Sequence, residues 1–242
     1  VRARARLAVL RFVGRASLRR AECSVAISES LRRTMQEDVP TAKPEILLSG
    51  RPAREGVIRE QPPLAGLPET YVLSVANDYV HKDWDSLLDL FLGDPSLPTL
   101  VLVGAPRSER RADQVRRRVD GASQQRVVLW GPEADRDRIG RLYTHSSAYL
   151  AHSLLEAYPL TPHEAMAHGV SVIASDIPSH REVCGSEARY YDPRHLEHAG
   201  SEIEITLAAP RRGTPHRRVS ELSWSDNAVQ LRQILLQTAG LQ

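Results

Sequence analysis

The chain has 242 residues, of which 41% are apolar and 26% are charged, and its formal net charge is +2. This length and composition allow the burial of an α/β core in one large or two small domains, and so balanced a charge gives by itself no reason to expect a nucleic-acid partner. Because the sequence contains no run of about 18 apolar residues, it predicts no membrane-spanning segment.

The cysteines and histidines give no indication of a metal centre or of disulfide bonds. Cys23 and Cys184 have neither the spacing of a zinc site nor the density of a disulfide framework. None of the nine histidines forms a His-x3-His pair, and none stands with a cysteine at a metal-ligand spacing. We therefore expect no bound metal and a location in the reducing cytoplasm.

The first part of the chain, residues 1–56, begins with an arginine-rich stretch, Val1–Arg11. This stretch could be a targeting segment or a basic amphipathic helix, and a helix within a domain is favoured because the apolar part is short and lacks a small-residue cleavage site. Such a helix would offer a surface for peripheral membrane binding or self-association. After it the pattern predicts a strand at Cys23–Ser28, a helix from Glu29 to about Gln36 and a strand near Glu45–Ser49.

A linker is predicted at Val57–Thr70, because prolines and a glycine interrupt it. From there to residue 242, strand-like and helical stretches alternate, which is typical of βαβ units in a mostly parallel, doubly wound sheet. The strands are expected at Tyr71–Val75, Thr99–Val103, Arg126–Trp130, Ala148–Ala151, Val170–Ala174 and Arg189–Tyr191. The helices are expected at Trp84–Phe91, Arg110–Arg118, Arg136–Tyr143, Pro162–His168, Ser179–Val183 and Asp226–Gln237. The predicted fold class is therefore α/β.

Two carboxylates, Glu156 and Glu164, lie on either side of a predicted junction between a loop and a helix. Thr161 is expected to cap this helix and Pro162 to be its first residue, so that the free amides point back at the loop that carries Glu156. Glu156 follows an apolar run at the end of a predicted strand, where open α/β sheets place their ligands. The pattern thus predicts a site in which carboxylates hold sugar hydroxyls and a helix start holds phosphate.

Glu164 has a second interpretation. The sequence Thr161-x-x-Glu164 is also a capping box, in which the Glu side chain reaches back to the N-cap amide and only completes the helix. On local pattern alone this structural role is favoured, since such boxes are common at helix starts.

The wider context of the two carboxylates resembles a known family. Residues 153–169 read Ser-Leu-Leu-Glu-Ala-Tyr-Pro-Leu-Thr-Pro-His-Glu-Ala-Met-Ala-His-Gly. They are similar to the pattern Ser-x-x-Glu-Gly-Phe-Gly-Leu-Pro-x-x-Glu-Ala-Met-Ala-x-Gly of the retaining glycosyltransferases with the GT-B fold, family four of the sugar-enzyme classification. The resemblance covers Arg126–Pro193. The chain departs from the pattern at residues 157–159, where Pro159 removes one amide donor.

The resemblance implies a two-domain enzyme of which this chain carries the donor-binding half, residues 71–242. Ala26–Leu31 looks like the phrase that closes the family's first domain. Residues 1–56 are therefore expected to be the end of an acceptor-side domain whose earlier part has no counterpart here. The implied activity is the transfer of a sugar from a nucleoside diphosphate sugar to an unknown acceptor, with retention of anomeric configuration and without a metal or other cofactor.

The resemblance also implies roles for individual residues. Glu164 would hold the ribose hydroxyls of the donor and Glu156 the hydroxyls of its sugar. The amides of Leu160 and Thr161 would hold the diphosphate. Together with Lys82 they would stabilise the charge of the leaving group.

Lys82 belongs to a His-Lys-Asp phrase that is similar to the family's His-Lys-Asn. It and Lys43 are the only lysines among 32 basic residues, which fits the use of a compact ammonium for a phosphate contact. An exposed lysine at a helix start is the alternative that the local pattern leaves open.

Two further positions are predicted to contact the donor. Ala76-Asn77 stands where many relatives carry Gly-Arg, so Asn77 takes the place of a cationic contact. Trp130-Gly131 closes a predicted strand and resembles the phrase that lies against the nucleotide base in the family. A tryptophan at a strand end also commonly packs in the core, and this alternative stays open for Trp130.

The sequence also allows other interpretations of the chain. A non-catalytic nucleotide-sugar binding module, or a truncated and inactive relative, is the main alternative to the enzyme. A dehydrogenase is disfavoured because no Gly-x-Gly-x-x-Gly follows an early strand. Asp135-Arg-Asp137 matches the metal-binding Asp-x-Asp pattern of another glycosyltransferase fold, but it directly precedes a predicted helix and is better explained as acids of a first turn.

Overall fold

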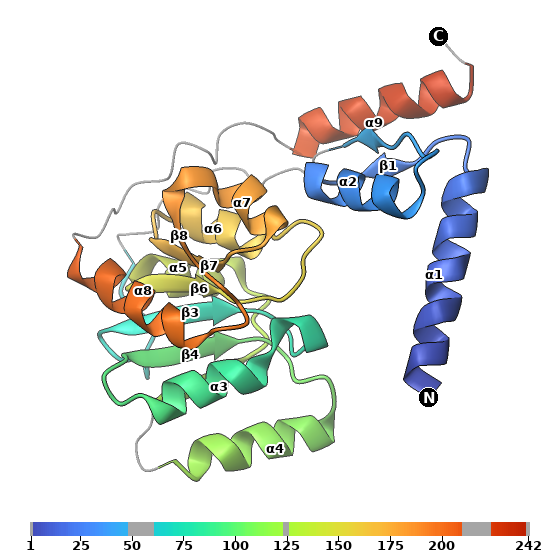
Figure 1. The fold of residues 1–242 in the computed structure, drawn as a ribbon. Coiled ribbons are helices and arrows are strands. Elements are labelled where there is room, and N and C mark those ends of the chain that lie inside the picture. The colour runs from blue at the N-terminus through green and yellow to red at the C-terminus, as the bar shows by residue number, and fades with distance from the viewer. Residues whose placement is uncertain (1, 48–60, 123–125, 210–223, 241–242) are drawn as a thin grey trace. The chain divides into compact units, whose positions relative to one another are not determined.

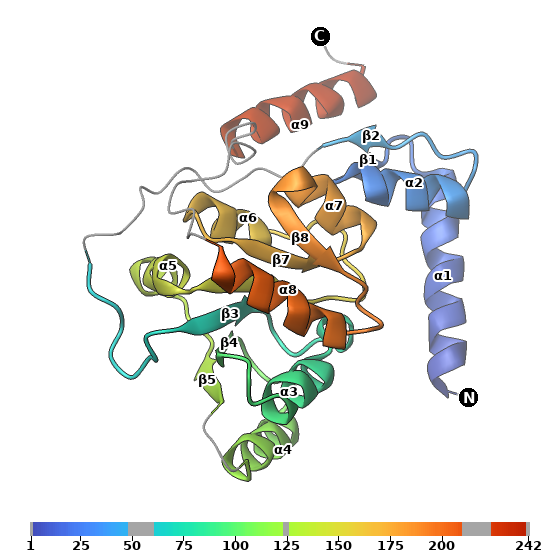
Figure 2. The ribbon, with the colours of Figure 1, turned by 60° about the vertical axis from the view of Figure 1, so that its left-hand side comes forward.

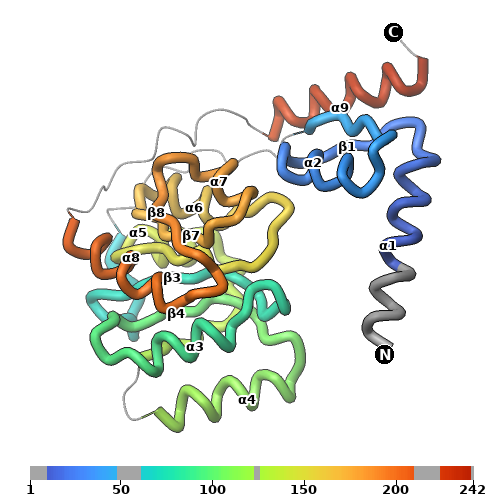
Figure 3. The backbone as a smooth tube through the Cα atoms, in the orientation of Figure 1, coloured from blue at the N-terminus to red at the C-terminus, as the bar shows by residue number. Residues whose placement is uncertain are grey.

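The computed structural model describes residues 2–47, 61–122, 126–209 and 224–240, with side chains from residue 10 onward (Figures 1 and 3). The chain divides into two compact units. The first consists of Val1–Arg51 together with Leu222–Gln242, and the second of Pro52–Glu221. None of the helices in these described ranges combines the length and the apolarity that crossing a bilayer requires.

The second unit is built on a parallel sheet with the strand order β5-β4-β3-β6-β7-β8. The strands are β3 (Tyr71–Val75), β4 (Thr99–Val103), β5 (Val127–Gly131), β6 (Ala148–Ala151), β7 (Val172–Ser175) and β8 (Ala188–Tyr191). The central strands are apolar and almost wholly buried, as parallel strands covered on both faces require. The α/β class that the sequence predicts is confirmed.

Helices cover both faces of this sheet (Figure 2). One face carries α3 (Trp84–Gly93), α4 (Glu109–Asp120) and α8 (Glu197–Ala208), and the other carries α5 (Arg136–His145), α6 (Thr161–Ala167) and α7 (Pro178–Cys184). Successive strand residues point to opposite faces, so Val72 packs on the α3 side and Tyr71 on the α5 side. Each face thus has its own hydrophobic core.

Helix α8 was not expected from the sequence. It contains Gly200 and several β-branched residues, which have low helix propensity, and no side chain caps its start. A Cβ at Gly200 would lie 3.9 Å from Leu97 and 4.0 Å from Leu90. Tertiary packing on the sheet therefore forms a helix that local preference does not favour.

The strand order reverses between β3 and β6. The chain first builds β3, β4 and β5 outward in one direction, and then returns to the other side of β3 to add β6, β7 and β8. In open parallel sheets such a reversal leaves a crevice at the carboxyl ends of the two strands, and ligands bind there. The carboxyl ends of β3 and β6 are therefore the first place to look for a site.

The first unit contains α1 (Arg2–Arg20), β1 (Val25–Ala26), α2 (Glu29–Asp38), β2 (Glu45–Ile46) and α9 (Trp224–Thr238). β1 and β2 pair in parallel, and Ser28 caps α2 by accepting from the Leu31 amide at 3.0 Å. The Gln230 side chain of α9 donates to the Ile46 carbonyl at 2.9 Å. The helix expected at Asp226–Gln237 is thus present, and it groups with residues 1–51 in this unit.

The segment expected to be a linker is attached to the second unit from Gln61 onward; residues 57–60 lie outside the described part of the chain. Arg141 of α5 donates to the Pro62 carbonyl at 2.9 Å, and the Nε2 of His145 donates to the Gln61 carbonyl at 2.9 Å. Leu64 is buried in the core on the α5 side. This segment therefore helps to cover α5.

Gly104, directly after β4, is required by the close approach of two loops. Its φ is +152°, and a Cβ at this position would lie 2.0 Å from the carbonyl oxygen of Ala76. We predict that Gly104→Ala lowers the free energy of unfolding by roughly 3 kcal/mol, because backbone strain and overlap add. Urea unfolding followed by circular dichroism measures this change.

Gly93→Ala is the matched control for that substitution. Gly93 lies at the end of α3 with open space around its Cα, so alanine there should leave stability unchanged or raise it by up to about 1 kcal/mol. Equal losses in the two variants would contradict the proposed close approach.

Candidate active site

Lys82 and Glu156 meet at the carboxyl ends of β3 and β6. Lys82 is the last residue of the 3₁₀ turn η1 (Val80–Lys82), and Glu156 lies in the loop after β6. Lys82 Nζ and Glu156 Oε1 form an ion pair in which 16% and 13% of the two side chains are exposed. Such a pair offers an ammonium to an anionic ligand group and a carboxylate to ligand hydroxyls. The two residues predicted as catalytic thus lie together at the carboxyl ends of β3 and β6.

Asp83 fixes the corner at which Lys82 stands. Its φ is +39°, and it alone among the described residues other than glycine has a positive φ. Its carboxylate caps α3 by accepting from the Ser86 hydroxyl at 2.7 Å and from the Ser86 amide at 3.4 Å. The left-handed conformation turns the chain from η1 into α3, so the Lys82 side chain projects from a sharp turn and not from a flexible loop.

The predicted capping box at the start of α6 is wrong. The helix begins at Thr161, its N-cap is Leu160, and no side chain makes a capping bond there. Glu164 instead accepts a hydrogen bond from the Tyr143 hydroxyl at 2.8 Å. The Thr161 side chain lies close enough to the Tyr149 hydroxyl to lower the pKa of that phenol, although burial raises it more. Both side chains of the expected box are therefore used in tertiary contacts with neighbouring elements.

Tyr143, on α5, is a site residue that the sequence did not indicate. Burial, and next the nearby Glu164 carboxylate, raise its pKa well above the ordinary value. The phenol therefore stays protonated and donates to Glu164, which fixes one carboxylate oxygen of the residue predicted to bind ribose. In the sequence Tyr143 reads as an ordinary core residue of an amphipathic helix, so no local signal could have revealed this role.

The remaining predicted donor contacts have structural partners of their own. The Trp130 indole N–H donates to Glu133 at 3.1 Å, and the Arg138 guanidinium lies 5.4 Å from the centre of its ring. The Asn77 side-chain oxygen accepts from the Ala105 amide at 2.9 Å and so joins the loops after β3 and β4. These contacts account for the conformation of both side chains without a ligand, and their contact with a donor stays a prediction.

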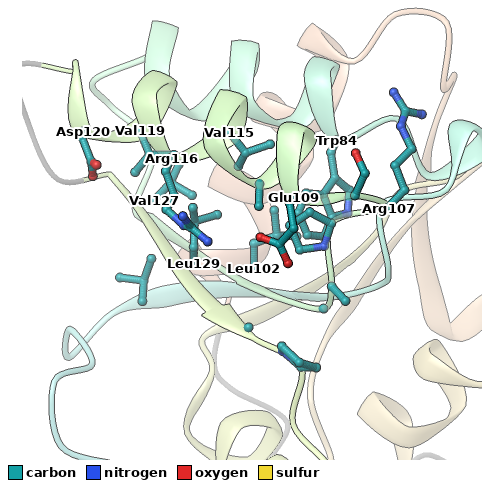
Figure 4. A pocket seen from close by; sticks show the side chains of 18 residues that line it. Trp84, Leu102, Arg107, Glu109, Val115, Arg116, Val119, Asp120, Val127 and Leu129 are labelled. Atoms are coloured by element: carbon teal, nitrogen blue, oxygen red, sulfur yellow. The ribbon is translucent and has the colours of Figure 1, made fainter.

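A pocket of about 620 Å³ lies between α4 and the strands β4 and β5 (Figure 4). Apolar side chains line it from the strands and from α4, and charged side chains line it from α4 and the loop before α4. Gly131 also lines it. Lys82, Glu156 and Glu164 do not, so the pocket is separate from the crevice that holds the ion pair. The apolar residues include Leu102, Val115, Val127 and Leu129, and the charged ones are Arg107, Glu109, Arg116 and Asp120.

Asp135-Arg-Asp137 forms a helix start, as expected. The Asp135 carboxylate accepts from the amides of Asp137 and Arg138 at 2.9 and 3.3 Å and thereby caps α5. Across the part of the chain that the structure describes, no group of three or more His, Cys, Asp or Glu side chains is arranged to hold a metal ion.

Two buried histidines lie near the ion pair. Burial lowers the pKa of His152 and of His180 to about 4. Both histidines are therefore neutral near pH 7. Between pH 6.5 and pH 4 they stay mostly neutral in the folded state, whereas the same side chains take up a proton when unfolding exposes them to water.

This difference predicts an acid-sensitive fold. Because the unfolded state binds more protons than the folded state between pH 6.5 and pH 4, the free energy of unfolding should fall as the pH is lowered through this range, by roughly 3 kcal/mol for each histidine. Urea unfolding at several pH values measures the slope. His180→Asn should reduce the slope, whereas the same substitution at the exposed His198 should not, and equal slopes in all proteins would contradict the assignment.

Comparison with known proteins identifies the relatives of this chain. The profile of the family described as glycosyl transferases group 1 matches residues 59–205. No curated protein sequence gives a significant match.

Several solved structures are similar to the chain. HepE from Anabaena, in complex with UDP and glucose, is 16% identical, with a TM-score of 0.73 over 93% of this chain and 66% of that protein. Sucrose-phosphate synthase from Thermosynechococcus elongatus is 24% identical, with a TM-score of 0.75 over 95% and 61%. α,α-Trehalose 6-phosphate synthase from Burkholderia multivorans is 14% identical, with a TM-score of 0.73 over 90% and 60%. The chain thus spans two thirds or less of the length of these proteins, and the likeness confirms the GT-B fold that the sequence predicts.

Proposed function

The chain belongs to the group 1 glycosyl transferases, and we propose that it takes its sugar from a nucleoside diphosphate sugar and transfers it to an acceptor hydroxyl with retention of anomeric configuration. The proposal needs no metal ion or other cofactor. The observation that carries it is the Lys82–Glu156 ion pair at the reversal of strand order. HepE, whose structure holds UDP and glucose, gives independent support for a nucleotide-sugar donor.

The two members of the ion pair take different parts of the donor. The Lys82 ammonium contacts the diphosphate and stabilises the negative charge that grows on it as the bond to the sugar breaks. Glu156 accepts hydrogen bonds from the sugar hydroxyls and holds the anomeric carbon near the acceptor. The diphosphate also lies against the amides of Leu160 and Thr161, which are the N-cap and the first residue of α6.

The nucleoside lies on the other side of the diphosphate. Glu164, held by the Tyr143 hydroxyl, accepts from the ribose hydroxyls, and the base lies against the end of β5 at Trp130 and Gly131. A carboxylate that already accepts a hydrogen bond from a buried phenol keeps one orientation, so less entropy is lost when the ribose binds.

The first test compares donor binding by the wild type and Glu164→Gln. In a buffer with EDTA, the wild type should bind UDP-glucose or GDP-mannose in a calorimeter, and Glu164→Gln should bind the same donor about tenfold more weakly, a loss of about 1.4 kcal/mol. Stability should change by less than about 1 kcal/mol, because the glutamine oxygen can still accept from Tyr143.

Glu202→Gln is the control for this test. Glu202 is also partly buried, with 26% of its side chain exposed, but it lies on α8 and pairs with Arg189. It should leave donor affinity unchanged. An equal affinity of Glu164→Gln and the wild type would refute the ribose contact, and donor binding without any sugar transfer would favour a non-catalytic nucleotide-sugar binding module.

The second test separates the phosphates. Lys82→Met should weaken the binding of UDP by tenfold or more and change the binding of UMP little, because the proposed contact of Lys82 is with the phosphate that only UDP has. Lys43→Met, which removes the other, exposed lysine, should change neither. Equal losses for UDP and UMP would show that Lys82 does not contact the diphosphate. Lys82→Met/Glu156→Gln repeats the UDP measurement without an unpaired carboxylate.

A further inference from the structure

The loops that carry Lys82 and Glu156 are joined to each other beneath the ion pair. The carbonyl oxygen of His81 accepts two hydrogen bonds from the opposite loop, from the Leu154 amide at 2.7 Å and from the Ser153 hydroxyl at 3.1 Å. His81 directly precedes Lys82, and both donors lie within three residues of Glu156. The junction therefore holds the backbone of the two loops together next to the ion pair.

Ser153 is held in turn by the ends of the two strands beyond β6. Its amide donates to the Ser175 hydroxyl at 3.0 Å, and the Ser175 hydroxyl donates to the Tyr191 hydroxyl at 3.3 Å. Ser175 ends β7 and Tyr191 ends β8. The chain of bonds closes at His152, whose Nδ1 lies 2.8 Å from the Tyr191 hydroxyl. At most 3% of any of these four residues is exposed.

The Tyr191 oxygen accepts from Ser175, which leaves its own proton for His152 in the tautomer whose Nδ1 is the acceptor. The neutral imidazole then carries its proton on Nε2, which has no partner among the described residues. His152 thus ends the chain of bonds as an acceptor, and an apolar side chain in its place would leave a buried phenol without one.

We propose that His152 is a positioning residue for the donor site: through Tyr191, Ser175 and Ser153 it holds the loop of Glu156 against the turn of Lys82. This inference rests on the proposed function. If the loop is released, Glu156 and Lys82 no longer meet the sugar and the diphosphate in one geometry. Glu164, on α6, is held separately by Tyr143 and keeps its contact with the nucleoside.

The test uses His152→Leu, which removes the acceptor, His152→Asn, whose side-chain oxygen can take the place of Nδ1, and Tyr191→Phe, which removes the hydroxyl. Calorimetry measures the affinities of the full chain for UMP, UDP and UDP-glucose. For His152→Leu and Tyr191→Phe we expect a five- to tenfold loss for UDP and UDP-glucose and less than a twofold change for UMP. His152→Asn should stay within about threefold of the wild type for all three ligands.

Tyr71→Phe is the matched control. Tyr71 is as buried as Tyr191, and its hydroxyl donates to the Leu142 carbonyl at 2.7 Å. It begins β3, however, and so lies at the amino ends of the strands, away from the ion pair at their carboxyl ends. It should lower stability as Tyr191→Phe does and leave all three affinities unchanged. If His152→Leu does not fold, Tyr191→Phe and His152→Asn still carry the test.

Three results would overturn the inference. Equal losses for UMP, UDP and UDP-glucose in Tyr191→Phe would show general destabilisation. Wild-type affinities in both Tyr191→Phe and His152→Leu would show that the bonds do not position the loops, although the proposed function would stand. A wild-type chain that binds none of the three ligands, nor the guanosine compounds GMP, GDP and GDP-mannose, would instead refute the proposed function, and the inference with it.

Discussion

The reversal of strand order between β3 and β6 is the constraint on which the site depends. In a parallel sheet the carboxyl ends of all strands lie on the same side. From there the chain runs to a helix on one face of the sheet or on the other. After β3 it turns to α3, and after β6 to α6 on the other face. The two loops therefore lead to opposite faces, and they carry Lys82 and Glu156, whose side chains form an ion pair where the loops begin.

In the proposed function, the donor replaces the contact between Lys82 and Glu156. Removing an ammonium and a carboxylate from water costs several kcal/mol, and their mutual attraction offsets this cost only while they remain paired. In the proposed function, a diphosphate competes with Glu156 for Lys82, and the sugar hydroxyls donate to the carboxylate that is released. A ligand with only one of these two groups would leave one charge without a partner, so the proposed site selects a molecule that carries phosphate and sugar together.

The sequence predicts best what depends on short stretches of the chain. The limits of β3, β4 and β6 agree with the expected ones, because branched apolar runs are bounded there by turn residues. The sequence does not predict contacts between side chains that lie far apart in the chain. Thr161-x-x-Glu164 has the pattern of a capping box, yet Tyr143, 21 residues earlier, takes the carboxylate. Helix α9 contains the predicted Asp226–Gln237 and is longer at both ends, from Trp224 to Thr238, but periodicity does not tell which unit it packs on. Lys82 and Glu156 could be brought together only by the resemblance and by the rule for parallel sheets.

The buried network beneath the ion pair also determines the charge of the site. His152 and Lys82 lie close enough for Lys82 to lower the pKa of the imidazole, in addition to the larger effect of burial. A charged imidazole at this position would repel the ammonium and attract Glu156 away from it. Because burial keeps His152 neutral, it can accept from Tyr191 without altering the balance between Lys82 and Glu156. This position thus requires an uncharged side chain that can form a hydrogen bond. Histidine meets that requirement only while it is buried from water. The stability of the packing around β6, β7 and β8 and the electrostatics of the crevice are therefore coupled through one side chain.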